Sequence, residues 1–225
     1  MKIGLLFAMP SELRALPGIR EMRPAETVSG TPFYEIAPHI IACAGGIGKV
    51  NAAMAAQTLC LKFGADLILN AGVAGCTSPL PAGTVAVVTD CVQYDMDLTA
   101  VGAAAGFVPT VERVEFPTWE PDFCAKTLEA AGFPAVMGRV ATADRFVTDT
   151  PDAVRLQNTF APLLVDMEAC AIAQVCLRNG VKFVSIKTVS DCVFGGGLTD
   201  ASLAFALERL GRTVPPLAEA LRDMA

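Results

Sequence analysis

Residues 40–75, IIACAGGIGKVNAAMAAQTLCLKFGADLILNAGVAG, decide the fold class of this chain. An apolar strand is expected at 40–44, a glycine turn follows, helical periodicity covers 49–63 and a second apolar strand is expected at 67–70. Gly64 has the position of a C-cap glycine, which ends the helix before the second strand begins. A strand, a helix and another strand in this order predict a mainly parallel sheet flanked by helices.

The same alternation extends to both ends of the chain, and we expect one α/β domain over residues 1–225. Further strands are expected at 2–9, 33–36, 84–92, 135–142, 163–165 and 182–189. Further helices are expected at 10–16, 122–131 and 167–179, and from 201 onward with an interruption at Pro215-Pro216. Residues 99–121 lack a regular pattern and are expected to form a long functional loop.

The composition limits the partners of the protein. Of the 225 residues, 53% are hydrophobic and 18% charged, with a net charge of −6, so a large core is expected under an acidic surface. Such a surface repels the phosphates of nucleic acids, which excludes them as expected partners. The N-terminal segment does not have the pattern of a signal peptide, and we find no apolar run long enough to span a bilayer. We therefore expect a cytoplasmic protein without a membrane partner.

The cysteines and the single histidine also restrict the chemistry. None of the eight cysteines has CxxC spacing and most lie in apolar segments, so they are expected to be reduced core residues. His39, between Pro38 and Ile40, is expected in a turn. One histidine excludes a His-rich metal site, and no metal is expected. Acid–base chemistry therefore falls mainly to Asp and Glu side chains.

Three carboxylates lie just after expected strands. They are Glu12, Glu168 and Asp191. Ligands of such sheets bind outside the carboxyl ends of the strands, where these side chains would meet. Each one alone also suits a structural role, because acids stabilise the first turn of a helix and Asp is a common cap. The three together favour a functional site, in which partial desolvation would let Asp191 hold a proton, with the Ser190 hydroxyl orienting it.

The glycine turn at 45–49 does not have the spacing of a nucleotide-phosphate loop. It lacks GxxxxGK[ST], because Val50 follows Lys49, and no GxGxxG follows the first expected strand. A dinucleotide-binding enzyme is therefore disfavoured. Glycines here permit close backbone approach, which suits a tight turn and also a site where the chain touches a sugar.

Several segments together identify a family. They are Ala8-Met9-x-x-Glu12, Gly46–Val50, Asn70-x-Gly72-x-Ala74-Gly75, Tyr94–Gly102 with Gly106-x-x-Pro109, Asp166–Ala173 and Thr188–Asp191. In this order they resemble the 5′-methylthioadenosine/S-adenosylhomocysteine nucleosidases of the nucleoside phosphorylase and nucleosidase superfamily. The resemblance covers nearly the whole chain; residues 111–134 and the last turns match loosely. It implies a three-layer α/β/α fold with a mixed, mainly parallel central sheet, a purine nucleoside as substrate, no cofactor and a homodimer.

The resemblance also implies roles for individual residues. Asp191, supported by Ser190, would protonate N7 of adenine, Glu12 would activate the attacking water, and Glu168 would hold the ribose hydroxyls. Carboxylates beside the sugar would stabilise the oxocarbenium-like transition state. The remaining expected substrate-binding residues are Met9, Ile47, Val73, Ala74, Gly75, Phe146 (stacked on the base), Val147 (reading the adenine edge), Met167, Lys187 and Pro109 (near the 5′ pocket of the partner subunit).

Two positions depart from the family pattern. Val73 replaces a common Ser, and Lys187 replaces the usual Arg and so loses its bidentate fork. Both changes weaken a phosphate site, which favours hydrolysis over phosphorolysis. The Ala- and Gly-rich loop 101–108 allows a roomier 5′ pocket. The resemblance makes methylthioadenosine the leading substrate, and because relatives act on futalosine or other adenosyl compounds, these come second. The sequence also leaves open a nucleoside phosphorylase and a nucleoside-binding relative without turnover.

Overall fold

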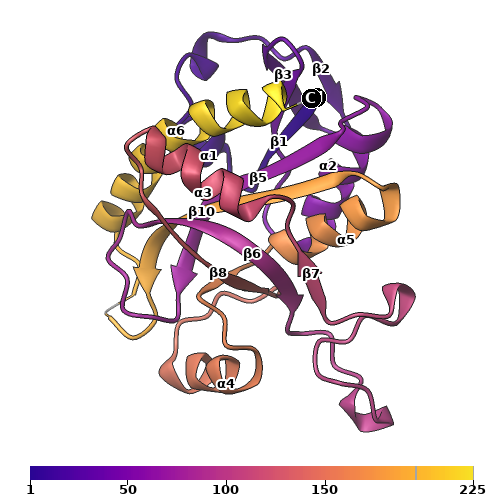
Figure 1. The fold of residues 1–225 in the computed structure, drawn as a ribbon, viewed down its shortest axis with the longest axis vertical. Helices are drawn as coiled ribbons and strands as arrows, with labels where there is room; N and C mark the ends of the chain where they lie inside the picture. The colour runs from indigo at the N-terminus through magenta and orange to yellow at the C-terminus, as the bar shows by residue number, and fades with distance from the viewer. Residues whose placement is uncertain (196, 225) are drawn as a thin grey trace.

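A computed structural model describes residues 1–195 and 197–224. Ten strands form one sheet, shown as arrows in Figure 1. The strands are β1 (Ile3–Phe7), β2 (Glu26–Val28), β3 (Thr31–Ala37), β4 (Ile40–Ala44), β5 (Leu67–Cys76), β6 (Val85–Gln93), β7 (Glu115–Pro117), β8 (Ala135–Thr142), β9 (Leu164–Asp166) and β10 (Lys182–Cys192). The α-helices are α1 (Pro10–Leu13), α2 (Lys49–Leu61), α3 (Pro121–Ala130), α4 (Thr150–Phe160), α5 (Ala169–Asn179) and α6 (Asp200–Asp223). Short 3₁₀ helices cover Ile19–Glu21, Thr99–Val101 and Pro109–Val111.

The sheet is mixed, with parallel pairing at its centre. β1 lies between β4 and β5, and β5 continues to β10, all in parallel. β6, β8 and β9 follow in parallel, while β10 meets β6 and β9 meets β5 in antiparallel pairs, so this half of the sheet closes on itself. The expected mixed α/β fold is therefore confirmed.

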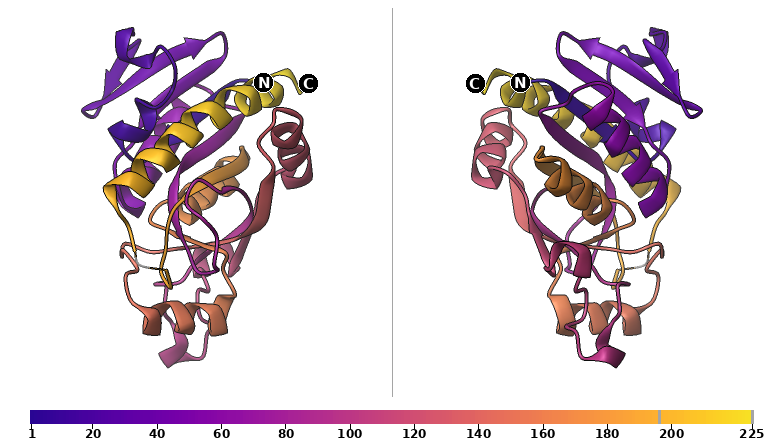
Figure 2. Two further views of the ribbon diagram at one scale, coloured as in Figure 1. Left: turned by 90° about the vertical axis from the view of Figure 1, so that its left-hand side faces the viewer. Right: turned by 90° about the vertical axis from the view of Figure 1, so that its right-hand side faces the viewer.

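Helices cover both faces of the sheet, as expected for three layers. The buried side chains of α2 and α5 belong to one hydrophobic core, and those of α1, α3 and α6 to the core on the opposite face. α4 packs in a smaller third cluster, and in Figures 1 and 2 it lies at the lower end of the molecule with the segment 99–111. The two termini are adjacent, because the Met1 amino group donates to the Arg222 carbonyl at 2.7 Å.

Helix α6 continues through Pro215 and Pro216, so the expected interruption there is wrong. One face of this helix, including Leu210, Val214 and Leu221, is completely buried against the sheet. Its packing outweighs the hydrogen bonds that the two prolines cannot donate.

Other elements differ from the expectation in extent. β5 extends to Cys76, so the segment 71–75 belongs to the strand and does not follow it. The pattern did not predict α4, whose Asp149 N-cap accepts a hydrogen bond from the Asp152 amide at 2.8 Å. The expected loop at 99–121 contains two 3₁₀ helices and β7.

Several smaller predictions hold. His39 lies in the turn between β3 and β4 with φ of 67°. The eight cysteines are free thiols, and all except Cys60 and Cys192 are buried. Within the described part of the chain, no helix has both the length and the apolarity needed to cross a bilayer.

Candidate active site

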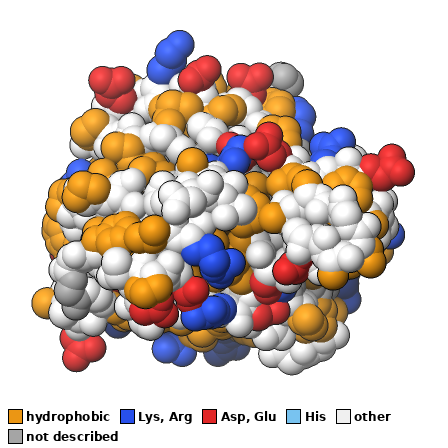
Figure 3. Space-filling model, turned by 90° about the horizontal axis from the view of Figure 1, so that it is seen from below, with side chains coloured by type: hydrophobic (Ala, Val, Ile, Leu, Met, Phe, Trp, Pro, Cys, Tyr) orange, Lys and Arg blue, Asp and Glu red, His pale blue; other side chains and the backbone are white. Residues whose placement is uncertain are grey.

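A cavity of about 160 Å³ opens where β1, β5 and β10 end. In Figure 1 the arrowheads of β5 and β10 point to the lower end of the molecule, and Figure 3 views that end, where apolar and charged side chains are mixed. Its wall is built from the strand ends and the loops that follow them, which is where α/β sheets bind ligands. The lining residues are Ala8, Met9, Glu12, Ile47, Val73, Ala74, Gly75, Arg145, Phe146, Val147, Val165, Asp166, Met167, Glu168, Ser190, Asp191, Leu198 and Leu203.

Glu12 is held by three backbone N–H groups. Its Oε2 accepts from the amides of Ala8 at 3.0 Å and Met9 at 2.8 Å, and its Oε1 accepts from the Val73 amide at 2.8 Å. Burial raises the pKa of Glu12, although these hydrogen bonds and the charge of Lys187 lower it in part. A carboxylate that is fixed in place and holds a proton more readily than usual suits a general base.

Asp191 lies at a bulge near the end of β10, where the pairing with β5 shifts by one residue. The Ser190 hydroxyl donates to Asp191 Oδ1 at 2.6 Å and lies 3.2 Å from the Ala74 carbonyl oxygen. With Oδ1 engaged in this way, Oδ2 remains available to contact a ligand in the cavity. Both residues are almost completely buried, so the pair faces the cavity rather than bulk solvent.

Glu168 precedes helix α5 and reaches the glycine turn from the opposite side of the cavity. Its Oε1 accepts from the Gly48 amide at 2.8 Å. Burial and the neighbouring Asp166 carboxylate raise the pKa of Glu168 to about 7, against the lowering effect of Lys187 and the Gly48 amide. With its pKa raised in this way, the Glu168 carboxyl group can donate to ligand hydroxyls when protonated and accept from them when ionised.

A buried ion pair lies behind these acids. Lys187 Nζ is 2.8 Å from Asp166 Oδ2, and each side chain is only 2% exposed. Asp166 also accepts from the Thr142 hydroxyl at 2.6 Å and from the Ala169 amide at 3.0 Å. Burial lowers the pKa of Lys187, but the charges of Asp166, Glu168 and Glu12 raise it overall, so the ammonium stays charged.

The structure brings most of the predicted site residues together. All of them line the cavity except Lys187 and Pro109. Lys187 lies behind the wall, where it forms an ion pair with the lining residue Asp166, and Pro109 is exposed on a 3₁₀ helix. Ile47 and Phe146 are about half exposed at its opening, with exposed fractions of 52% and 55%.

Sequence reasoning missed six lining residues, namely Ala8, Arg145, Val165, Asp166, Leu198 and Leu203. Asp166 and Arg145 adjoin predicted site residues, and that adjacency is the signal that could have identified them. Leu198 lies just before α6 and Leu203 lies in its first turn, and no pattern in the sequence marks them. Across residues 1–195 and 197–224, no group of three or more His, Cys, Asp or Glu side chains is arranged to hold a metal ion.

Comparisons with known proteins agree with this geometry. The family model of the phosphorylase superfamily matches residues 2–224. A 5′-methylthioadenosine/S-adenosylhomocysteine nucleosidase of Treponema pallidum is 33% identical, over 91% of this chain and 86% of the relative.

Two solved structures from Helicobacter pylori are similar over nearly their whole length. Native futalosine hydrolase has a TM-score of 0.89 and 26% identity, covering 98% of both chains. A mutant nucleosidase with 5′-methylthioadenosine in its active site has a TM-score of 0.88 and 25% identity, covering 97% of this chain and 98% of the other.

Proposed function

This chain belongs to the phosphorylase superfamily and, within it, to the 5′-methylthioadenosine/S-adenosylhomocysteine nucleosidases, and from that membership we propose that it hydrolyses the N-glycosidic bond of an adenine nucleoside. The products are adenine and a 5-substituted ribose. One observation carries the proposal. Three buried carboxyl groups, Glu12, Glu168 and Asp191, face one cavity, each with a different set of hydrogen-bond partners.

The different surroundings of these acids support different roles. Asp191 gives a proton to N7 of the base, which makes adenine a better leaving group, and Ser190 keeps its Oδ1 in place. Glu12 takes a proton from the attacking water as the bond to the base breaks. Such general acid and base steps each contribute about 10²–10⁴ in rate. Glu168 binds the ribose hydroxyls, and the negative charges beside the sugar stabilise the oxocarbenium-like transition state.

The apolar wall supports recognition of an adenine ring. Phe146 stacks on the base and the Val147 backbone contacts its edge, while Met9, Ile47 and Met167 pack on the sugar side. Ala74 and Gly75 follow Val73 along β5, and Gly75 lies next to Asp191, because a Cβ there would lie 3.4 Å from Asp191 Oδ2 and 3.2 Å from Val165 Cγ2.

Water, rather than phosphate, is the nucleophile in this proposal. Phosphate sites use convergent donors and cations. Arg145 is the single Lys or Arg among the described lining residues, and it already pairs with Asp149 and Asp152. Lys187 is bound to Asp166, and the Val73 amide is bound to Glu12, so neither is free to hold an anion.

The leading candidate substrates carry a 5′-methylthio or 5′-homocysteinyl group, and futalosine is the second candidate substrate. The similarity to native futalosine hydrolase supports futalosine as that second candidate. The loop 101–108, which is rich in Ala and Gly, does not line the cavity of the single chain. The 5′ side of the cavity is therefore open to substituents of different size. Cleavage of 5′-methylthioadenosine would give the enzyme a role in methionine salvage.

We also propose that the enzyme is a homodimer that works in the cytoplasm. Helix α2 is apolar on its outer face as well, where Val50 is 79% and Leu61 73% exposed, and a second copy would cover these side chains. Pro109 would then approach the 5′ side of the partner's cavity. Eight free thiols suit a reducing compartment. Sedimentation at micromolar concentration tests the dimer, since a monomer would leave this face uncovered.

The first test incubates the protein with 5′-methylthioadenosine and follows free adenine by chromatography, in buffer with and without phosphate. Adenine and free methylthioribose in the absence of phosphate support the hydrolase. Adenine release that requires phosphate, with a sugar 1-phosphate as product, identifies a phosphorylase instead. If adenine is not released in either buffer, S-adenosylhomocysteine and futalosine are tested next, and failure with all of them indicates a binding protein.

A further inference from the structure

The turn that brings Ile47 into the cavity wall begins helix α2 at Gly48 without a side-chain cap. Gly46 and Gly48 have φ of 105° and 93°, in the region that favours glycine. The first amides of the helix instead donate to acids from distant segments. Gly48 donates to Glu168, and Lys49 donates to Asp144 Oδ1 at 2.7 Å. Carboxylates stabilise a helix N-terminus, so the place of this turn depends on both acids.

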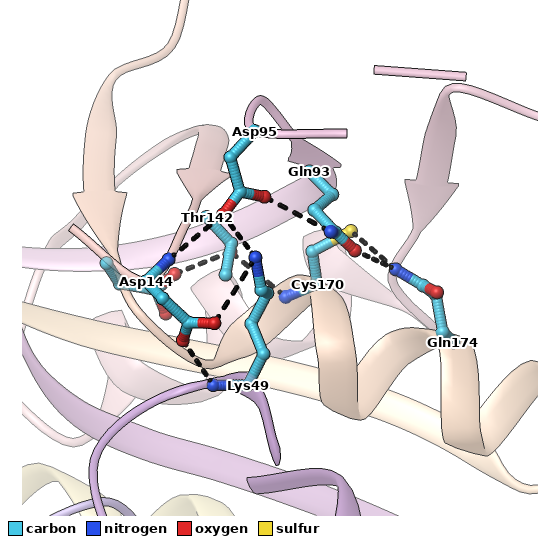
Figure 4. Close-up of polar contacts among 8 residues, drawn as sticks. Lys49, Gln93, Asp95, Thr142, Asp144, Cys170 and Gln174 are labelled. Carbon is cyan, nitrogen blue, oxygen red and sulfur yellow. Dashed lines mark hydrogen bonds and ion pairs between the residues drawn. The ribbon is translucent and has the colours of Figure 1, made fainter. Parts of the chain in front are cut away.

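The side chain of Lys49 extends from the same turn and joins two more segments, as Figure 4 shows. Its ammonium forms an ion pair with Asp95 and lies 3.4 Å from Asp144 Oδ2. The Asp144 amide donates to Asp95 Oδ2 at 3.2 Å. The cluster therefore connects the start of α2, the segment after β6 and the loop after β8.

Amide side chains extend the cluster to helix α5. Gln93 donates to Asp95 Oδ1 at 3.1 Å, and Gln174 donates to Gln93 Oε1 at 2.8 Å. Burial raises the pKa of Asp95, but Lys49, the Asp144 amide and Gln93 outweigh it and lower the pKa below its usual value. The carboxylate is thus ionised opposite the ammonium, and the contact is a charged one.

Two residues of this cluster are sequence neighbours of the cavity wall, which indicates a role in holding that wall in place. Asp144 immediately precedes Arg145, Phe146 and Val147 of the cavity wall, and Lys49 immediately follows Gly48. Lys49, Asp95 and Asp144 are themselves absent from the lining. They therefore link the sugar side of the cavity to the base side from behind, without touching a ligand.

We propose that Lys49 is a positioning residue, which together with Asp95 and Asp144 holds the glycine turn at a fixed distance from the loop of Phe146 and Val147. This inference rests on the proposed function, because it assigns the turn to the ribose and the loop to adenine. Removing the ammonium leaves the Asp95 and Asp144 carboxylates facing each other without a cation. Their repulsion then moves the base-side loop away from the turn.

The test compares Lys49→Met and Lys49→Arg with Lys62→Met as the matched control. Lys62 is the C-cap of the same helix and forms a surface ion pair with Glu26, remote from the cavity. We expect Lys49→Met to raise KM and lower kcat/KM by about 10- to 100-fold, since small misplacements of a binding wall have effects of this size. Lys49→Arg keeps the charge and should restore most of the loss, while Lys62→Met should match the wild type.

A normal KM in Lys49→Met would overturn the inference, as would an equal defect in the Met and Arg variants. If Lys49→Met is insoluble, Asp144→Asn decides instead, because it keeps an acceptor for the Lys49 amide and removes one charge. The wild type separates the two proposals. If it releases no adenine, the proposed function fails, and calorimetric binding of adenine to the same variants then tests the positioning role: equal affinity in wild type and Lys49→Met would refute it.

Discussion

Gly72 lies directly against Glu12 of the candidate active site, so closely that a Cβ atom at position 72 would come within 2.7 Å of Glu12 Oε1. The same oxygen accepts the Val73 amide at 2.8 Å, so the strand backbone and the carboxylate fit together without spare room. Gly72 is in an extended strand with ordinary φ, and contact rather than conformation therefore requires glycine here.

Gly72→Ala should displace the Glu12 carboxylate and lower kcat/KM by about 10- to 100-fold, because the proposed general base would no longer be aligned with the attacking water. Overpacking should also cost about 1–3 kcal/mol of unfolding free energy. Steady-state kinetics and urea unfolding measure the two effects. In a Glu12→Asp background the shorter carboxylate leaves space, so the same substitution should cost clearly less stability. An equal loss of unfolding free energy in both backgrounds would show that the added methyl group does not clash with the Glu12 side chain.

Asp191→Asn should lower kcat by about 10²–10⁴ while leaving the unfolding free energy nearly unchanged. The Asn carbonyl can still accept from Ser190, so the local packing is preserved, but the proposed proton donor to the base is removed. Kinetics and thermal unfolding of the same preparation test this. If stability and activity fall together, Asp191 is a structural cap and the proton donor lies elsewhere.

The raised pKa of Glu168 predicts how stability changes with pH. The folded value is about 7 and the ordinary value 4.5, so the folded protein holds a proton that the unfolded chain releases between these pH values. Glu168 therefore contributes stability that is fully present below pH 4.5 and is lost as pH rises to about 7. Glu168→Gln cannot ionise and should lose less stability than the wild type between about pH 5 and pH 8. Chemical denaturation at a series of pH values measures the unfolding free energy of both proteins. If the two free energies change with pH in parallel, this prediction is wrong.

The acids of the site could be predicted from sequence because their geometry follows from the fold. Parallel strands bring their carboxyl ends to one edge of the sheet, so Glu12 after β1 and Asp191 near the end of β10 are expected at the same edge. Their meeting in one cavity also requires β1 and β10 to flank β5, which the sequence pattern does not predict.

The partnership of Lys187 could not be predicted, because it depends on the order of strands in the sheet. Its strand β10 and Asp166 on β9 lie on either side of β5, which they both pair with. Sequence spacing says nothing about this arrangement, and it was the family resemblance that implied contact of Lys187 with the substrate. The interruption expected at Pro215 and Pro216 is wrong for a related reason. Local helix propensity predicts a break there, but the burial of α6 against the sheet outweighs it.

The Asp166–Lys187 pair should be more important for folding than for contact with the substrate. Lys187→Met would leave the buried Asp166 side chain without its cation, and removing one partner of such a pair costs about 3–5 kcal/mol. Asp166→Asn combined with Lys187→Met removes both charges and should recover part of that cost, so urea unfolding of the single and double variants measures the coupling. Loss of Lys187 also removes a positive charge that lowers the pKa of both Glu12 and Glu168, so the acid limb of kcat/KM should move to higher pH. If Lys187 bound the substrate directly, Lys187→Met would instead raise KM without moving that limb or destabilising the fold.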